Sequence, residues 1–118
     1  MTEHRKALAE RHCAPCQGKL VALETQQIER LSGELDSAWT IENGKSLTRS
    51  FRFKGFAKAS YLANLCVWLA DREGHHPDIA FGWGYCQITL TTHDIDGLSE
   101  NDFIWAAQLD KLISSAAS

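Results

Sequence analysis

Residues 74–94 read GHHPDIAFGWGYCQITLTTHD, and they contain a helix-ending glycine, a strand pattern and three of the chain's five histidines. Gly74 is the residue type that most readily adopts the left-handed conformation closing a helix. From Tyr85 to His93 apolar and polar residues alternate, which predicts a strand. Its apolar face holds Cys86, Ile88 and Leu90, and His93 lies on its polar face. A further short strand near 78–81 is compatible with this pattern.

Helical spacing of apolar residues is found before and after this stretch. Residues 56–73 have apolar side chains at three- and four-residue steps, which predicts a long helix that ends at Gly74. A shorter helix is predicted over 25–35 with Thr25 as its cap. A last helix is expected after Ser99, because Asp102 stands three positions later, as in a capping box.

The segment between the first two helices predicts a β-hairpin. Asn43-Gly44 is a strong turn signal, and alternating residues flank it over 39–42 and 47–53. Arg49 interrupts the apolar face of the second strand, so we expect it near an edge of the sheet. The order of elements therefore predicts an α+β domain in which an antiparallel sheet packs against helices.

Composition limits the classes of protein to consider. A chain of 118 residues, 44% of them hydrophobic, is the size of one globular domain. The net charge of −3 disfavours binding to the phosphate backbone of nucleic acids. We expect no membrane segment, because no stretch approaches the roughly 18 apolar residues of a span. The polar N-terminus predicts a cytoplasmic protein. Cys66 and Cys86 fall within helix and strand patterns and are expected to be buried.

The N-terminal residues carry a separate motif. We divide the chain into an arm over 1–23, which contains Cys13-Ala-Pro-Cys16, and a single domain over 24–118. A Cys-x-x-Cys pair is compatible with half of a zinc site, with a redox pair or with a structural role. His4 and His12 are candidate further ligands for zinc. The sequence does not choose among these interpretations.

The histidine cluster also has several interpretations. Pro77 favours an extended backbone at His76, and successive side chains in extended backbone point to opposite sides. We therefore do not expect His75 and His76 to bind one metal ion together. The chain can turn back so that His93 approaches them, and histidine both donates and accepts protons near neutral pH. Half-exposed loop histidines, an acid–base site and a metal site all remain open on spacing alone.

The motif as a whole resembles the pterin-4a-carbinolamine dehydratases. The resemblance spans roughly residues 24–113 and rests on several parts in order. These are Trp39, the Ser50–Phe56 segment, Asp71, His75-His76-Pro77-Asp78, Trp83, Ile88–Asp94 and Gly97–Asp102. Trp83 stands where the family often has tyrosine, and Ile79-Ala80 replace a bulkier aromatic pair.

The resemblance implies a fold, a reaction and an assembly. The fold is a four-stranded antiparallel sheet with helices packed on one face. The reaction is loss of water from a 4a-hydroxytetrahydropterin to give the quinonoid dihydropterin, with neither a metal nor another cofactor. It recycles the tetrahydrobiopterin-type cofactor of aromatic amino-acid hydroxylases. The implied assembly is a homodimer or a homotetramer.

The resemblance also suggests roles for individual residues. We expect His75 and His93 to be catalytic and to exchange protons with the pterin, while His76 holds it. Pro77, Trp83 and Asp71 are the other candidate substrate-binding residues. Trp83 would stack on the pterin or fill the rim of its pocket. Asp71 would orient an imidazole or be a solvated acid at the helix end.

The capping role of Asp102 explains that residue without catalysis. An alternative function for the whole chain is a non-catalytic one on the same scaffold, as an assembly protein or a transcriptional cofactor.

Overall fold

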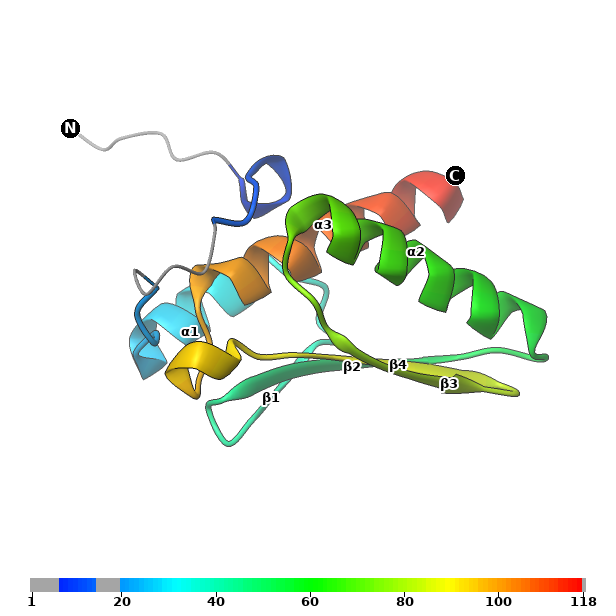
Figure 1. The fold of residues 1–118 in the computed structure, drawn as a ribbon, viewed down its shortest axis with the longest axis horizontal. Helices are drawn as coiled ribbons and strands as arrows, with labels where there is room; N and C mark the ends of the chain where they lie inside the picture. The colour runs from blue at the N-terminus through cyan, green and yellow to red at the C-terminus, as the bar shows by residue number, and fades with distance from the viewer. Residues whose placement is uncertain (1–6, 15–19, 118) are drawn as a thin grey trace.

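The computed structural model describes residues 7–14 and 20–117, and it forms one sheet covered on one face by helices (Figure 1). The helices are α1 (Thr25–Ser32), α2 (Ala57–Glu73) and α3 (Glu100–Ala117). The strands are β1 (Thr40–Glu42), β2 (Ser46–Arg52), β3 (Asp78–Gly82) and β4 (Tyr85–Leu90). Two short 3-10 helices, η1 (Leu8–Glu10) and η2 (His93–Ile95), complete the described elements. The predicted α+β class with a four-stranded antiparallel sheet is confirmed.

The sheet has the strand order β1-β2-β4-β3, and all three pairings are antiparallel. The short strand near 78–81 is real and forms an edge of the sheet as β3. On β4 the predicted alternation is confirmed: Cys86, Ile88 and Leu90 are fully buried, whereas Tyr85 and Gln87 are exposed. The buried side chains meet residues from the helices, among them Leu69, Phe103 and Leu109, in one hydrophobic core.

The predicted turn and helix ends mostly have the conformations that their residues favour. Asn43 and Gly44 have φ values of 54° and 68°, and the Lys45 N–H donates to the Glu42 carbonyl 2.9 Å away. Gly74 closes α2 with a φ of 67°. The predicted cap of α1 was wrong. Thr25 is the first helical residue, and the capping box is formed by Glu24 and Gln27.

Arg49 does not lie at the sheet edge, so that prediction was also wrong. It is on β2, an inner strand, and its guanidinium contacts Asp110 of α3 at 2.7 Å and Asp36 at 3.6 Å. Trp39 Nε1 also donates to Asp110, at 2.8 Å. A charge is tolerated on this face because acidic partners from other elements meet it.

The strand that leads to His93 is shorter than predicted. β4 ends at Leu90, and the chain then turns tightly, with the Thr92 N–H donating to the Gly97 carbonyl at 2.9 Å. Asp96 has a φ of 48°, a left-handed conformation that aspartate tolerates better than most residues. His93 therefore begins η2 and does not lie on the polar face of a strand. This turn brings His93 to the end of the sheet where α2 stops.

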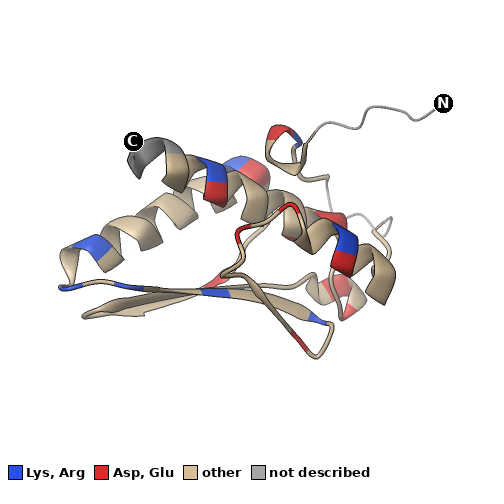
Figure 2. Cartoon of the chain, turned by 180° about the vertical axis from the view of Figure 1, so that it is seen from behind, with Lys and Arg blue, Asp and Glu red and all other residues tan. Residues whose placement is uncertain are grey.

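Charged residues are interspersed along the described elements, and no continuous basic stretch is visible on them (Figure 2). No helix in the described part of the chain is long and apolar enough to cross a membrane.

Candidate active site

The three histidines of the 74–94 stretch line one open pocket of about 190 Å³. Two turns form it, one between α2 and β3 and the other after β4. In the sheet β3 and β4 are antiparallel neighbours, so the start of β3 lies beside the end of β4. The lining residues are Gly74, His75, His76, Thr91, Thr92, His93 and Asp94.

His75 and His76 differ sharply in their surroundings. The side chain of His75 is buried, whereas His76 is exposed. Such a difference is expected where successive side chains point to opposite sides of the backbone. His93 is exposed at the other wall of the pocket. The pocket thus combines one largely buried, fixed imidazole with two exposed ones.

A buried carboxylate holds the ring of His75. Its Nε2 atom lies 2.6 Å from Oδ1 of Asp102, which is fully buried. An ionised carboxylate only accepts hydrogen bonds, so Nε2 carries the proton of this bond. Among the described residues, the Nδ1 atom of His75 has no partner. Nδ1 is therefore the ring nitrogen left for a molecule in the pocket.

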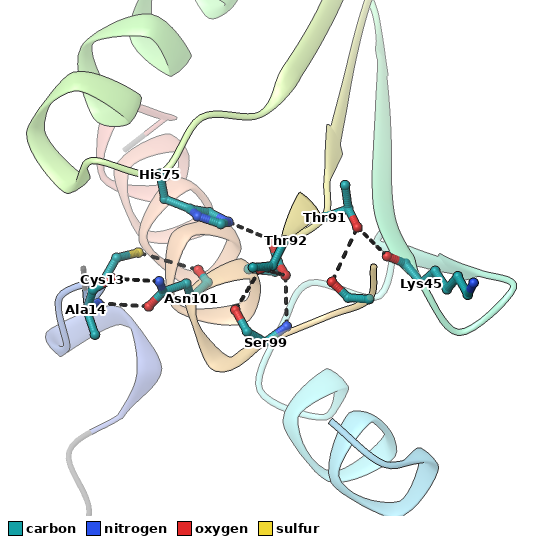
Figure 3. A network of polar contacts seen from close by, with 10 residues as sticks. Cys13, Ala14, Lys45, His75, Thr91, Thr92, Ser99 and Asn101 are labelled. Carbon is teal, nitrogen blue, oxygen red and sulfur yellow. Dashed lines mark hydrogen bonds and ion pairs between the residues drawn. The ribbon is translucent and has the colours of Figure 1, made fainter. Parts of the chain in front are cut away.

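Asp102 is itself held by two further donors. Its Oδ2 atom accepts hydrogen bonds from the Thr92 hydroxyl at 2.8 Å and from the Ser99 N–H at 3.0 Å. The hydroxyls of Thr92 and Ser99 also bond to each other, at 2.7 Å (Figure 3). The predicted capping bond to Ser99 is present, and the same carboxylate orients an imidazole. A connected hydrogen-bond network of this kind fixes the orientation of the carboxylate and of the imidazole.

The other candidate residues are placed differently. Asp71 is exposed on α2 and does not line the pocket, and the carboxylate bonded to His75 is Asp102. Trp83 lies 72% exposed in the turn between β3 and β4, at the opposite end of the hairpin from the pocket. Pro77 is half-buried just before β3 and does not line the pocket. The pocket of a single chain thus brings together the histidines but neither Asp71 nor Trp83.

The contacts that Thr92 of the turn after β4 and Asp102 of α3 make around His75 were not predicted from the sequence. Thr92 and Asp102 are ten residues apart, and Asp102 is 27 residues from His75. The one signal for Asp102 was its place at the end of the family-like pattern. The Cys13–Cys16 motif is only partly described, because Cys16 lies outside the described residues. Within the described ranges no group of three or more His, Cys, Asp or Glu side chains could hold a metal ion.

A small α+β domain with a histidine pocket backed by a buried carboxylate is a scaffold suited to acid–base chemistry on a small molecule. Comparison with known proteins identifies the family. The model of the family described as pterin 4 alpha carbinolamine dehydratase matches residues 21–112. The chain belongs to this family.

Relatives and solved structures agree with this assignment. A protein of Rubrobacter xylanophilus, provisionally named pterin-4-alpha-carbinolamine dehydratase, is 46% identical and aligns over 89% of this chain and 97% of its own. A Legionella pneumophila protein with the same name is 39% identical, over 90% and 95%.

Two solved structures share the fold. The transcriptional coactivator/pterin dehydratase from Brucella melitensis has a TM-score of 0.70 and 27% identity, covering 77% of this chain and 97% of its own. A pterin dehydratase-like RuBisCO assembly factor of the alpha-carboxysome has a TM-score of 0.53 and 28% identity, covering 64% and 88%.

Proposed function

We propose that the chain dehydrates a 4a-hydroxytetrahydropterin to the quinonoid dihydropterin and water. The observation that carries this proposal is the pocket in which His75, fixed by Asp102, faces the same space as His76 and His93. Family membership and the names of the relatives support the same reaction class, a lyase that removes water.

The reaction needs two proton transfers and no change of redox state. The C4a–O bond breaks, and the departing hydroxide takes a proton from an acid and leaves as water. The N5–H proton passes to a base, and its electron pair forms the C4a=N5 double bond. General acid–base catalysis of such steps contributes about 10² to 10⁴ in rate.

His75 and His93 are the residues that we assign to these transfers. Asp102 keeps the Nε2 proton of His75 in place, which leaves Nδ1 as the ring nitrogen for proton exchange. His93 faces the same pocket from η2. His76 is exposed beside them, and we assign it to holding the pterin. We keep Trp83 and Asp71 as substrate-binding candidates only if a second copy of the chain brings them to a pocket.

We also propose that the protein is a homodimer or homotetramer. Residues 59–70 of α2 contain no charged side chain, and the long tan stretch of α2 in Figure 2 reflects this. Three large apolar side chains on that helix are strongly exposed: Tyr61 at 69%, Val67 at 57% and Trp68 at 49%. Apolar side chains gathered in this way are typical of an interaction surface. Light scattering coupled to size-exclusion chromatography measures the mass directly.

The physiological setting follows from the proposed reaction. We expect the protein to recycle a tetrahydrobiopterin-type cofactor for an aromatic amino-acid hydroxylase. The natural pterin is the one that such a hydroxylase oxidises. The cytoplasmic location expected from the sequence stays a prediction.

The test is an assay of dehydration with freshly generated 4a-hydroxytetrahydropterin. The wild type should accelerate the reaction above its spontaneous rate, and His75→Ala and His93→Ala should lose most of that acceleration. A wild type that does not accelerate the reaction would rule out the enzyme. The alternative of a non-catalytic assembly or cofactor protein would then be left.

A further inference from the structure

A segment of the N-terminal arm lies against the end of α2, which His75 follows in the chain, and against the start of α3, which carries Asp102. This segment, Arg11–Ala14, is called the strap below. The N–H of Cys13 donates to Oε1 of Glu73 at 2.9 Å, and the ring of His12 contacts Oε2 of Glu73 at 2.8 Å. Glu73 is the last residue of α2, two positions before His75.

The strap also bonds to the start of α3. The N–H of Ala14 donates to Oδ1 of Asn101, and Nδ2 of Asn101 donates to the carbonyl of Ala14, both at 2.8 Å. The Cys13 Sγ lies 3.5 Å from the Asn101 carbonyl oxygen. Asn101 is buried and directly precedes Asp102 in the chain. Figure 3 shows the strap on one side of Asn101 and the His75 network on the other.

Because Glu73 is buried, the end of α2 depends on the strap for hydrogen-bond partners of this carboxylate. The Glu73 side chain is only 1% exposed, and a buried carboxylate without partners is costly. Burial by itself raises the pKa of Glu73, but the Cys13 N–H, the His12 ring and Gln108 outweigh it, and the pKa is lowered overall. The strap thus supplies two of the groups that keep this carboxylate charged.

The two residues to which the strap bonds, Glu73 and Asn101, are close in the chain to the His75–Asp102 pair of the site. Glu73 is the last residue of α2, and His75 follows it in the turn to β3. Asn101 and Asp102 lie at the start of α3, and His75 meets Asp102 at 2.6 Å. Release of the strap would free both ends together. Catalytic geometry is sensitive to such shifts, since a misplacement of about 1 Å can cost about 10²-fold in rate.

We propose that the strap positions the His75–Asp102 pair by tying Glu73 to Asn101. Glu73 and Asn101 are positioning residues that act through their neighbours and do not touch the pterin. The kinetic part of this inference rests on the proposed dehydratase activity. The structural part, that the strap fixes the ring of His75, does not.

The experiment compares Ala14→Pro, Asn101→Ala and the double variant with Ala14→Ser. Ala14→Pro deletes the N–H that Asn101 accepts, at an exposed position outside α2 and α3. Ala14→Ser keeps that N–H and is the matched control. Two readouts are measured on each folded variant. They are kcat and KM for dehydration, and the NMR signal of the His75 Nε2 proton in the ligand-free protein.

We expect kcat to fall about tenfold or more in each single variant, with KM changed less than about twofold. The double variant should be no worse than the poorer single one, because both changes break the same contact. The Nε2 proton signal should shift or broaden in all three variants and stay unchanged in Ala14→Ser.

Unchanged kcat and an unchanged Nε2 signal in folded Ala14→Pro would overturn the inference. If Asn101→Ala does not fold, Ala14→Pro carries the test alone. If the wild type shows no dehydration, the proposed function fails, and the Nε2 signal still decides whether the strap positions His75.

Discussion

The Nε2 atom of His75 lies 2.6 Å from Oδ1 of Asp102, a fully buried carboxylate 27 residues later in the chain. This contact joins the turn after α2 to the start of α3. It also decides which nitrogen of His75 carries the proton, because an ionised carboxylate can only accept a hydrogen bond and Nε2 must donate it. The proton chemistry that we propose for the pocket depends on it.

Asp102→Asn should lower kcat by about 10²-fold or more, the lower end of what a positioned acid or base contributes. The amide can hold the ring in the other tautomer and cannot stabilise a charged imidazole. Steady-state kinetics checks this, with thermal unfolding measured in parallel because Asp102 also accepts the Ser99 N–H.

Asp96→Asn is the control for Asp102→Asn. Asp96 is exposed, and its left-handed φ of 48° suits asparagine equally well. If both variants keep wild-type kcat, Asp102 has no part in the reaction.

His76→Ala should raise KM several-fold and change kcat little, since we assign His76 to binding and not to proton transfer. A loss of interactions that are equally strong in ground and transition states appears in KM alone. Initial rates over a range of pterin concentrations separate the two constants. A large fall in kcat at unchanged KM would instead place His76 among the proton-transfer groups.

The site illustrates what could be predicted from the sequence. His75, His76 and His93 were identified as one cluster because they lie within a short stretch, and Gly74 and Pro77 have local conformational preferences that act on their neighbours. The helix of α2 and the buried face of β4 were predictable for the same reason. Their signals repeat every few residues and need no knowledge of the rest of the fold.

The contacts that could not be predicted all join residues distant in sequence. The charge of Arg49 is accommodated on an inner strand because the carboxylate of Asp110, 61 residues away in the chain, pairs with its guanidinium there. The partner of His75 was likewise not recognisable, since Asp102 had a sufficient local explanation as part of a capping box. In the sequence Glu73 is an ordinary acidic residue at a helix end, and its burial under the strap is visible only in the structure. Periodicity carries no information about such pairs.

Stability should fall in acid partly through Glu73. Burial raises the pKa of Glu73, but hydrogen bonds from the Cys13 N–H, His12 and Gln108 outweigh it, so the pKa in the folded protein lies below the ordinary 4.5. Arg72 also contacts this carboxylate, at 3.1 Å. At pH values between the lowered pKa and 4.5, the Glu73 carboxylate therefore binds more protons in the unfolded chain than in the folded protein. The contribution of Glu73 is therefore complete above pH 4.5 and is lost as the pH falls through the lowered value.

Glu73→Gln tests this sign. The variant should be less stable than the wild type at neutral pH, and the difference should shrink as the pH falls below 4.5. Urea denaturation at a series of pH values gives the free energy of unfolding for both proteins. A difference that stays constant down to acid pH would show that the charge of Glu73 does not contribute. Glu29→Gln, at an exposed position of α1, is the matched control.

Cys66 should resist alkylation in the folded protein. Burial, together with the nearby Cys86, raises the pKa of its thiol to about 12, and the thiolate is the nucleophilic form. Both side chains are fully buried. Mass spectrometry after iodoacetamide treatment at neutral pH should find Cys66 and Cys86 unmodified in the native state and modified in denaturant. Rapid native labelling of Cys66 would mean that the core opens readily.

Whether the histidine pocket is catalytic is decided by the rate of dehydration of freshly generated 4a-hydroxytetrahydropterin. It is compared among the wild type, His75→Ala, His93→Ala and the double variant. We predict saturable acceleration by the wild type and a loss of about 10² to 10⁴ in each single variant. The double variant should be little worse than the poorer single one, as expected for groups that act as a unit. A wild type no faster than the spontaneous reaction, or single variants with full activity, would show that these histidines do not catalyse the dehydration.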